Sequence, residues 1–293
     1  MNEIVIMSGK GGTGKTSIAA ALGVLAGTGA VVADCDVDAA NLHLLYEPEN
    51  REANEFWSGK TAVIDHESCV ECGICEEKCR FDAIHEQDGH LVVNGVDCEG
   101  CSVCHHLCPE KAIVMIDNRA GHWYVSKSRF GSWFVHAKLG IGQENSGKLV
   151  SKVKQEAKQL AEKEGVPYVI IDGPPGIGCP AIASLSGASH VLIVTEATRS
   201  GLHDVERLVS LLEFFKVNAS CIVNKFDIDP GVGGEIVRFC QKRQIEVVSQ
   251  IPYDRVFYEA LRAEKTLVET NDAEIKTKVE EVWNHLQKIG GAA

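Results

Sequence analysis

The sequence predicts an α/β protein built on a mostly parallel, doubly wound sheet with helices on both faces. Helical stretches alternate with short apolar runs from residue 148 to residue 289: we expect helices at 148–164, 204–216, 233–243 and 272–289, and strands at 168–172, 190–195, 219–224 and 245–251. Such alternation is typical of parallel sheets. An apolar run at 4–7, followed by a glycine-rich loop and an alanine-rich helix, begins the sheet. Eight of the twelve cysteines lie between these two parts, at 69–108.

Composition excludes several classes of protein. The 293 residues are 45% apolar and 24% charged, which is typical of soluble globular proteins. The sequence has neither an apolar run long enough to span a membrane nor the basic region and cleavage site of a signal peptide, so we expect a cytoplasmic protein without stable membrane binding. A net charge of −12 argues against binding to nucleic acid. Cysteines in a reducing compartment indicate metal ligation or redox chemistry rather than disulfides.

The loop after the first apolar run matches the phosphate-binding pattern G-x4-G-K-T. Its glycines allow backbone N–H groups to face the phosphates, its lysine reaches the β and γ oxygens, and the hydroxyl that follows binds Mg²⁺. Lys15 and Thr16 occupy the last two positions. We expect nucleotide contacts from Gly9, Lys10, Gly11, Gly12, Thr13, Gly14, Lys15, Thr16 and Ser17.

Further segments extend this pattern. One buried run ends in Asp34-Cys35-Asp36, and a second ends in Asp172, which is followed by Gly-Pro-Pro-Gly. With the additional lysine in the loop, Lys10, these segments resemble the MinD/ParA family of deviant Walker A ATPases. The resemblance implies a P-loop NTPase fold, bound ATP or ADP, and Mg²⁺. Asp34 and Asp38, which flank Asp36, either assist with Mg²⁺ or serve as cap and loop residues.

The resemblance also implies site roles. Catalysis would use Lys10, Lys15 and Asp36: Asp36 would orient or deprotonate the attacking water, and Lys10 would reach the phosphates of a partner across a nucleotide-sandwich dimer. The partner would be a second copy of the chain or a similar ATPase. Mg²⁺ would be held by Thr16, Asp36 and Asp172, and the adenine would be contacted by Asn224, Lys225, Pro252 and Asp254.

The eight clustered cysteines form two runs with the spacing C-x2-C-x2-C-x3-C, offset by 29 residues. Ala83-Ile84 recurs as Ala112-Ile113 at the same offset, which indicates an internal duplication. The pattern is similar to that of bacterial two-cluster ferredoxins. The resemblance implies two [4Fe-4S] clusters, one on Cys69, Cys72, Cys75 and Cys108 and the other on Cys79, Cys98, Cys101 and Cys104. Two four-thiolate zinc sites are the alternative, although such sites usually pair C-x2-C knuckles.

The cysteine segment is an insertion, because the phosphate loop precedes it and the Asp172 strand follows it. We expect an ATPase domain at 1–60 and 118–293 and an inserted α+β ferredoxin-like domain at 61–117. The insertion has twelve acidic and three basic residues, so it carries −9 of the total −12. The four remaining cysteines are best explained by packing in the ATPase scaffold.

Three functions fit these features. The first is a dimeric ATPase in which the nucleotide state controls electron transfer through the clusters to a redox partner. The second is an ATP-dependent factor for the assembly of iron–sulfur or other metal cofactors, acting on a client protein. The third is a MinD/ParA-like positioning ATPase, which the net acidity disfavours. A cobyrinic acid a,c-diamide synthase is less consistent still, because no chain remains for a glutaminase domain.

Overall fold

The computed structural model describes residues 1–140, 142 and 146–291, and it divides into two compact units. The first unit comprises residues 1–53, 123–137 and 146–293, and the second comprises 54–122 and 138–145. The chain passes between them within three strands, β3 (Glu49–Ile64), β6 (Ile113–Lys127) and β7 (Trp133–Leu139), and a fourth time where α5 (Ser146–Glu164) begins. We describe each unit separately.

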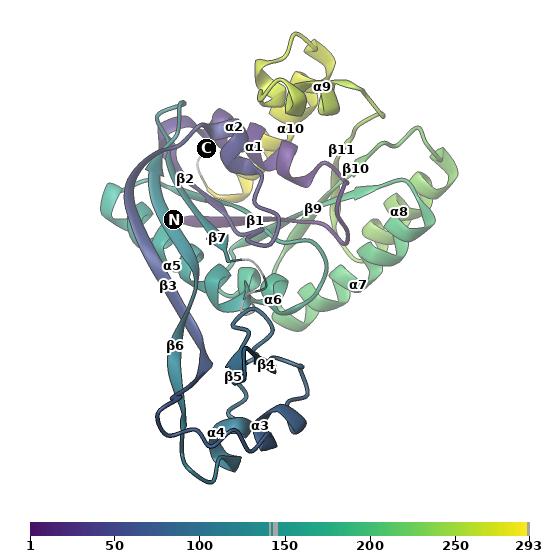
Figure 1. Cartoon of the computed structure of the whole chain (residues 1–293). Coiled ribbons are helices and arrows are strands. Elements are labelled where there is room, and N and C mark those ends of the chain that lie inside the picture. The colour runs from purple at the N-terminus through teal and green to yellow at the C-terminus, as the bar shows by residue number, and fades with distance from the viewer. Residues whose placement is uncertain (141, 143–145, 292–293) are drawn as a thin grey trace. The chain divides into compact units, whose positions relative to one another are not determined.

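The first unit alternates strands and helices, as the sequence predicts (Figure 1). Its strands are β1 (Asn2–Met7), β2 (Ala30–Asp34), β8 (Tyr168–Asp172), β9 (His190–Glu196), β10 (Ala219–Asn224) and β11 (Glu246–Gln250). Its helices are α1 (Lys15–Ala26), α2 (Leu42–Tyr46), α5 (Ser146–Glu164), α6 (Cys179–Leu185), α7 (Arg199–Phe215), α8 (Pro230–Lys242), α9 (Val256–Arg262) and α10 (Ala273–Ile289), with the 3-10 turns η1 (Gly27–Gly29) and η2 (Leu267–Glu269).

The sheet has nine strands in the order β11-β10-β9-β1-β8-β2-β7-β6-β3. The pairings from β11 to β7 are parallel, which confirms the mostly parallel sheet. The register of the strands brings candidate site residues together at their carboxyl ends. Asp34 is paired with Asp172, and Asn224 is paired with Glu196. Loops at this edge of an open α/β sheet commonly form ligand sites.

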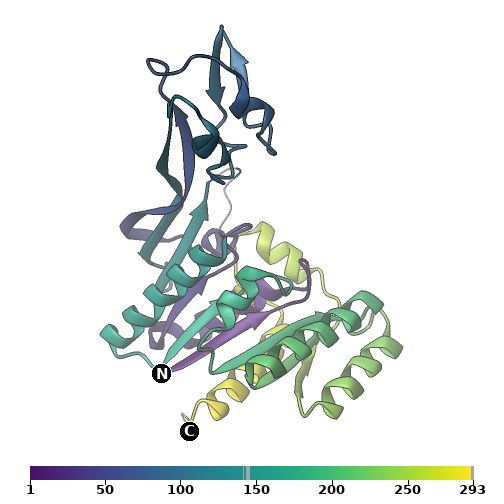
Figure 2. The same ribbon diagram turned by 90° about the horizontal axis from the view of Figure 1, so that it is seen from below.

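Both faces of this sheet are covered by helices. Ile4, Ile6 and Ile170 point to one face, where they pack with α1 and α10 in a single apolar cluster. Helices α5 and α7 lie over the opposite face (Figure 2) and contact strands β2, β8 and β9. Successive residues of a strand point to opposite faces of the sheet, and both faces are covered. The strands are therefore apolar along their length rather than at every second residue.

The last helix packs into the core rather than standing apart. Ile275, Val279, Val282, Trp283 and Leu286 of α10 are all buried, as their helical spacing predicts. In the part of the chain that the structure describes, no helix combines the length and the apolar character needed to cross a membrane.

Several elements differ from expectation. Helix α7 begins at Arg199 rather than at 204, because Thr198 caps it by accepting a hydrogen bond from the Gly201 N–H. The short helices α2, α6 and α9 were not predicted, since five to seven residues carry little periodicity. The expected domain boundaries, at 60/61 and 117/118, fall inside the long strands β3 and β6.

Among its described residues, the second unit holds two short helices and a hairpin. Helices α3 (Ile74–Glu77) and α4 (Val103–Leu107) contact each other, and β4 (Ile84–Gln87) pairs antiparallel with β5 (His90–Val93). Its apolar cluster is small and contains cysteines, being made of Ala62, Ile64, Cys75, Ile84, Leu91 and Ile113 with Cys69, Cys79, Val93, Cys98, Cys104, Cys108 and Met115 packed against them.

The 29-residue repeat is visible in the backbone. Three pairs of residues at this offset share a left-handed conformation: Glu71 and Gly100 (φ 53° and 63°), Gly73 and Ser102 (74° and 66°), and Asp82 and Lys111 (50° and 54°). Left-handed non-glycine residues are uncommon. Their recurrence at matching positions supports an internal duplication, because the two halves repeat the same unusual turns.

Candidate functional site

The phosphate-binding loop lies between β1 and α1, at the carboxyl edge of the sheet. Helix α1 begins at Lys15 directly after Gly14, which has φ 92°. A Cβ atom at Gly14 would stand 2.6 Å from the Asn224 side-chain nitrogen. That nitrogen donates to the Thr13 carbonyl at 2.8 Å, so β10 supports the loop from behind. Glycine is required here by both conformation and space.

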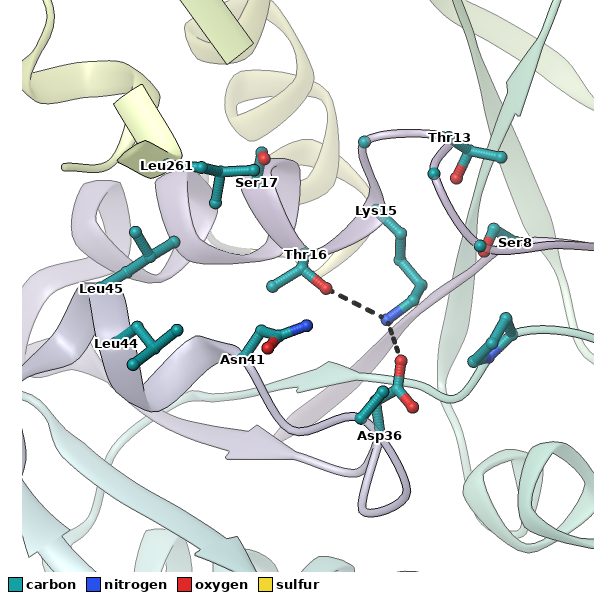
Figure 3. A pocket seen from close by; sticks show the side chains of 15 residues that line it. Ser8, Thr13, Lys15, Thr16, Ser17, Asp36, Asn41, Leu44, Leu45 and Leu261 are labelled. Atoms are coloured by element: carbon teal, nitrogen blue, oxygen red, sulfur yellow. Dashed lines mark hydrogen bonds and ion pairs between the residues drawn. The ribbon is translucent and has the colours of Figure 1, made fainter. Parts of the chain in front are cut away.

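The Lys15 ammonium is the centre of a compact polar group (Figure 3). Its Nζ donates to Asp172 Oδ1 at 2.6 Å and lies 3.6 Å from Asp36 Oδ2. The Thr16 hydroxyl donates to the other Asp172 oxygen at 2.7 Å. Of the four residues expected from the resemblance to hold phosphate and Mg²⁺, three therefore lie around the fourth, Lys15.

Burial and charge set the protonation of this group. Burial opposes the charged form of Lys15, but the carboxylates of Asp172 and Asp36 outweigh it, so the pKa of Lys15 is raised and the ammonium is retained. Burial also raises the pKa of the Asp36 carboxyl, against the opposing effect of Lys15. A carboxylate with a raised pKa is a better proton acceptor at neutral pH.

The neighbouring acidic residues have different surroundings. Asp34 is fully buried and accepts hydrogen bonds from the backbone N–H groups of Asp36 and Leu42 at 3.1 and 3.2 Å. Burial raises the pKa of its carboxyl well above the usual value. Asp34 therefore shapes the loop that carries Asp36, as expected of a cap residue. Asp38, on the same loop, is exposed.

Lys10 is held within its own chain. Its Nζ lies 2.6 Å from Glu196 Oε1 and donates to the Ser200 hydroxyl at 2.6 Å. Lys225 Nζ contacts the other Glu196 oxygen and the Gly12 carbonyl, each at 2.8 Å. Although partial burial opposes the charge of Glu196, these two ammonium groups lower the pKa of its carboxyl. Glu196, at the end of β9, thus anchors both lysines beside the loop.

A cavity of about 480 Å³ opens beside the loop. Residues 11–17 and Asp36 line it, and Figure 3 shows apolar side chains opposite Lys15. Asn224, Lys225, Pro252 and Asp254, expected at the adenine, are not among the described residues that line this cavity. Asn224 and Lys225 support the loop, and Asp254 accepts from the Val256 N–H at the start of α9.

Sequence reasoning missed two parts of this site. Glu196 lies in an apolar strand without a recognised motif, although its position at a strand end could have drawn attention. The part of the cavity wall that the sequence did not reveal consists of Asn41, which precedes α2, of Leu44 and Leu45 in α2, and of Leu261 in α9. Those elements are short and far apart in sequence, so no spacing connects them.

The second unit gathers its eight clustered cysteines into two sets of four. One small cavity is lined by Cys69, Cys72, Cys75 and Cys108, and another by Cys79, Cys98, Cys101 and Cys104. Each set takes three cysteines from one run and the last cysteine from the other. Ile64, Leu91 and Ile113 give the first cavity an apolar wall, and Ile84 and Met115 do so for the second.

All twelve cysteines have free thiols. Burial raises the pKa of the Cys75 and Cys104 thiols. Cys35, Cys221 and Cys240 are buried in the first unit, as a packing role predicts, whereas Cys179 at the start of α6 is exposed.

Comparisons with known proteins agree with this geometry. Residues 4–267 match the family model described as CobQ/CobB/MinD/ParA nucleotide binding domain. An uncharacterised protein of Methanocaldococcus jannaschii is 32% identical over 289 residues, covering 98% of this chain and 97% of the relative. The chain therefore belongs to the CobQ/CobB/MinD/ParA family of nucleotide-binding proteins.

Solved structures show the same fold. The septum site-determining protein MinD of Pyrococcus horikoshii, in complex with Mg-ADP, superposes with a TM-score of 0.59 at 17% identity and covers 99% of this chain and 97% of its own. A second similarity, to a different kind of protein, covers only part of this chain. Pyruvate synthase subunit PorD of Methanocaldococcus jannaschii is 33% identical over 76 residues, which are 25% of this chain and 88% of the subunit.

Proposed function

We propose that this chain is an ATPase whose nucleotide state controls electron transfer through two [4Fe-4S] clusters to a redox partner. The observation that carries the proposal is the coexistence, in one chain, of a phosphate-binding loop with its Lys15–Asp172–Thr16 group and two cavities that are each lined by four cysteines. Either feature alone would support only half of this function.

The nucleotide half rests on the polar group around Lys15. MgATP would take over the contacts that Lys15 and Thr16 make with Asp172, because phosphate oxygens and Mg²⁺ are the partners these side chains have in P-loop proteins. Asp36, with its raised pKa, would hold the attacking water and accept its proton. Lys10, released from Glu196, would act in a dimer with a second copy or a similar ATPase.

The redox half rests on the donor sets. Four thiolates around an apolar-walled cavity are the ligands that a [4Fe-4S] cluster takes, and the crossed grouping of the two runs is that of two-cluster ferredoxins. Such clusters, when bound, accept and pass on single electrons. We propose that residues 61–117 form this ferredoxin-like domain, inserted in the ATPase formed by 1–60 and 118–293; the similarity to PorD supports the assignment.

The chain itself offers a route for coupling. From Asp36 it runs through α2 directly into β3, the strand in which it passes to the second unit. Helix α2 is fixed to the P-loop helix, because the Tyr46 hydroxyl donates to the Ala20 carbonyl at 3.0 Å. A change at Asp36 on nucleotide binding would therefore act on the segment that leads into β3.

Iron and sulfide analysis with EPR tests the cluster assignment on anaerobically purified protein. We expect about eight iron atoms per chain, and a loss of about half of them in each of Cys72→Ser and Cys101→Ser, because these residues line different cavities. Cys179→Ser, which replaces an exposed cysteine of the first unit, is the matched control and keeps its iron. Zinc without iron in the purified protein would overturn the assignment.

A second candidate function, cofactor assembly, is favoured by one observation. Cys72 and Cys101 are exposed, at equivalent positions of the repeat, so each set has one thiol open to solvent. A factor that donates clusters needs such an approach. Incubation of the reconstituted protein with an apo-ferredoxin separates the two functions: retention of all iron by this chain supports electron transfer, and transfer of iron supports assembly.

A further inference from the structure

Three potential metal ligands meet on the second unit, and they line neither cysteine cavity. Nitrogen atoms of His66 and His90 and a carboxylate oxygen of Glu71 all lie within 4.8 Å of one another. The residues come from three segments: the turn after β3, the loop between the first two clustered cysteines, and the first position of β5. All three are exposed.

The carboxylate of this group is oriented by the backbone. Glu71 Oε2 accepts a hydrogen bond from the Leu91 N–H at 2.8 Å, and Oε1 lies 3.3 Å from His90 Nδ1. The same carboxylate is therefore tied to the strand that carries His90. Glu71 has a left-handed backbone (φ 53°), which is uncommon for a non-glycine residue.

The second histidine is also in a defined position. Asp65 accepts from the Glu67 N–H at 3.2 Å and from the Ser68 hydroxyl at 2.7 Å, which closes the turn that contains His66. The rings of His66 and His90 have their centroids 5.3 Å apart. Both imidazoles thus lie beside the one oriented carboxylate.

The distances between the ligand atoms fit tetrahedral coordination of a metal ion. Nitrogen and oxygen ligands lie about 2.1 Å from zinc, so two of them at a tetrahedral angle are about 3.4 Å apart. The separation between His90 Nδ1 and Glu71 Oε1 already has this value, at 3.3 Å. The third ligand atom, a nitrogen of His66, lies within 4.8 Å of the other two, so it needs a displacement of at most about 1.4 Å, which the rotation of an exposed imidazole supplies.

We propose that His66, Glu71 and His90 bind a divalent ion of the zinc class and leave the fourth position to water. Two imidazoles and one carboxylate are donors that suit zinc, nickel or cobalt, and three protein ligands with one open position is a recurrent zinc arrangement. The acidic surroundings, with a net charge of −9 over residues 61–117, favour a cation. The ion cross-links the cysteine loop to the β4–β5 hairpin.

Equilibrium dialysis of the full chain against micromolar Zn²⁺, with metals counted by mass spectrometry, tests the site. Because zinc also competes for thiolates, the readout is the difference between variants with all cysteines intact. Wild type is expected to bind about one zinc more per chain than His66→Ala/His90→Ala. His85→Ala, an exposed histidine of β4 outside the group, is the matched control and binds as wild type does.

A second variant tests the site even if the double variant His66→Ala/His90→Ala misfolds. Glu71→Gln keeps an acceptor for the Leu91 N–H but removes the charge, and we expect its zinc affinity to fall at least about tenfold. Zinc should also raise the thermal midpoint of wild type and of His85→Ala, but not of the other variants. Equal zinc binding by wild type, the double variant and Glu71→Gln would overturn the proposal and leave only a hydrogen bond between His90 and Glu71. The site contains no cysteine, so its ligands are distinct from those proposed for the clusters.

Discussion

Two aspartates separated by a single residue illustrate how position decides a role. Asp34 ends β2 with its side chain fully buried, and its two oxygens accept the N–H groups of Asp36 and Leu42. Asp36 lies in the loop that follows, within 3.6 Å of the Lys15 ammonium. The sequence alone left open whether Asp34 assists with Mg²⁺, because the direction of a side chain at a strand end depends on the neighbouring strands.

Replacement of Asp36 tests its chemical role. Asp36→Asn is expected to lower the rate of ATP hydrolysis by about 10²-fold or more, because an amide accepts no proton. Its stability should change little, since the side chain is partly exposed. Steady-state phosphate release and thermal unfolding provide the two measurements. Asp38→Asn, on the same loop but exposed, is the control and should keep wild-type activity; a comparable loss in both variants would contradict a specific role for Asp36.

At the scale of elements, prediction succeeded where the information was local. Strands β8 and β10 were predicted with the bounds observed, because a short, mostly apolar and almost entirely buried run marks a strand in the middle of a parallel sheet. Strand β3 was missed because its sequence is largely polar, and it forms only by joining the edge of the sheet next to β6. The cavity wall from α2 and α9 was missed because these helices are short and far apart in the sequence.

The repeat in the second unit offers a test of packing. Gly73 and Gly100 both have a left-handed backbone, but a Cβ atom at Gly100 would stand 2.1 Å from the Lys60 carbonyl oxygen, whereas nothing lies within 4 Å of one at Gly73. The counterpart of Gly73 in the other half is Ser102, which already carries a side chain. Contact with the Lys60 backbone, rather than conformation alone, therefore makes glycine necessary at position 100.

Alanine at these two positions should consequently have unequal effects. Gly73→Ala costs about 1 kcal/mol, because only the left-handed conformation is disfavoured. Gly100→Ala forces backbone apart, and we expect at least about 3 kcal/mol together with partial loss of iron from the cavity lined by Cys98 and Cys101. Urea unfolding and iron content measure both effects. A larger loss for Gly73→Ala would show that the contact with Lys60 is unimportant.

On the scale of the whole molecule, the chain combines a family scaffold with an acidic, cysteine-rich unit. The family model, the fold and the Lys15 group establish a nucleotide-binding protein of the CobQ/CobB/MinD/ParA type. The second unit has a small apolar core in which cysteines take a large part, so metal binding would contribute to its folding. Linkage between the two requires that the nucleotide state and the redox state influence each other reciprocally.

That reciprocity can be measured without knowing the redox partner. An EPR-monitored redox titration of the cluster-loaded protein should be made without nucleotide, with MgADP and with a non-hydrolysable MgATP analogue, for wild type and for Lys15→Ala. The account predicts that the analogue shifts the midpoint potential of at least one cluster by on the order of 60 mV, a tenfold coupling, and that Lys15→Ala shows no shift. Identical potentials in all nucleotide states of the wild type would contradict nucleotide control of electron transfer.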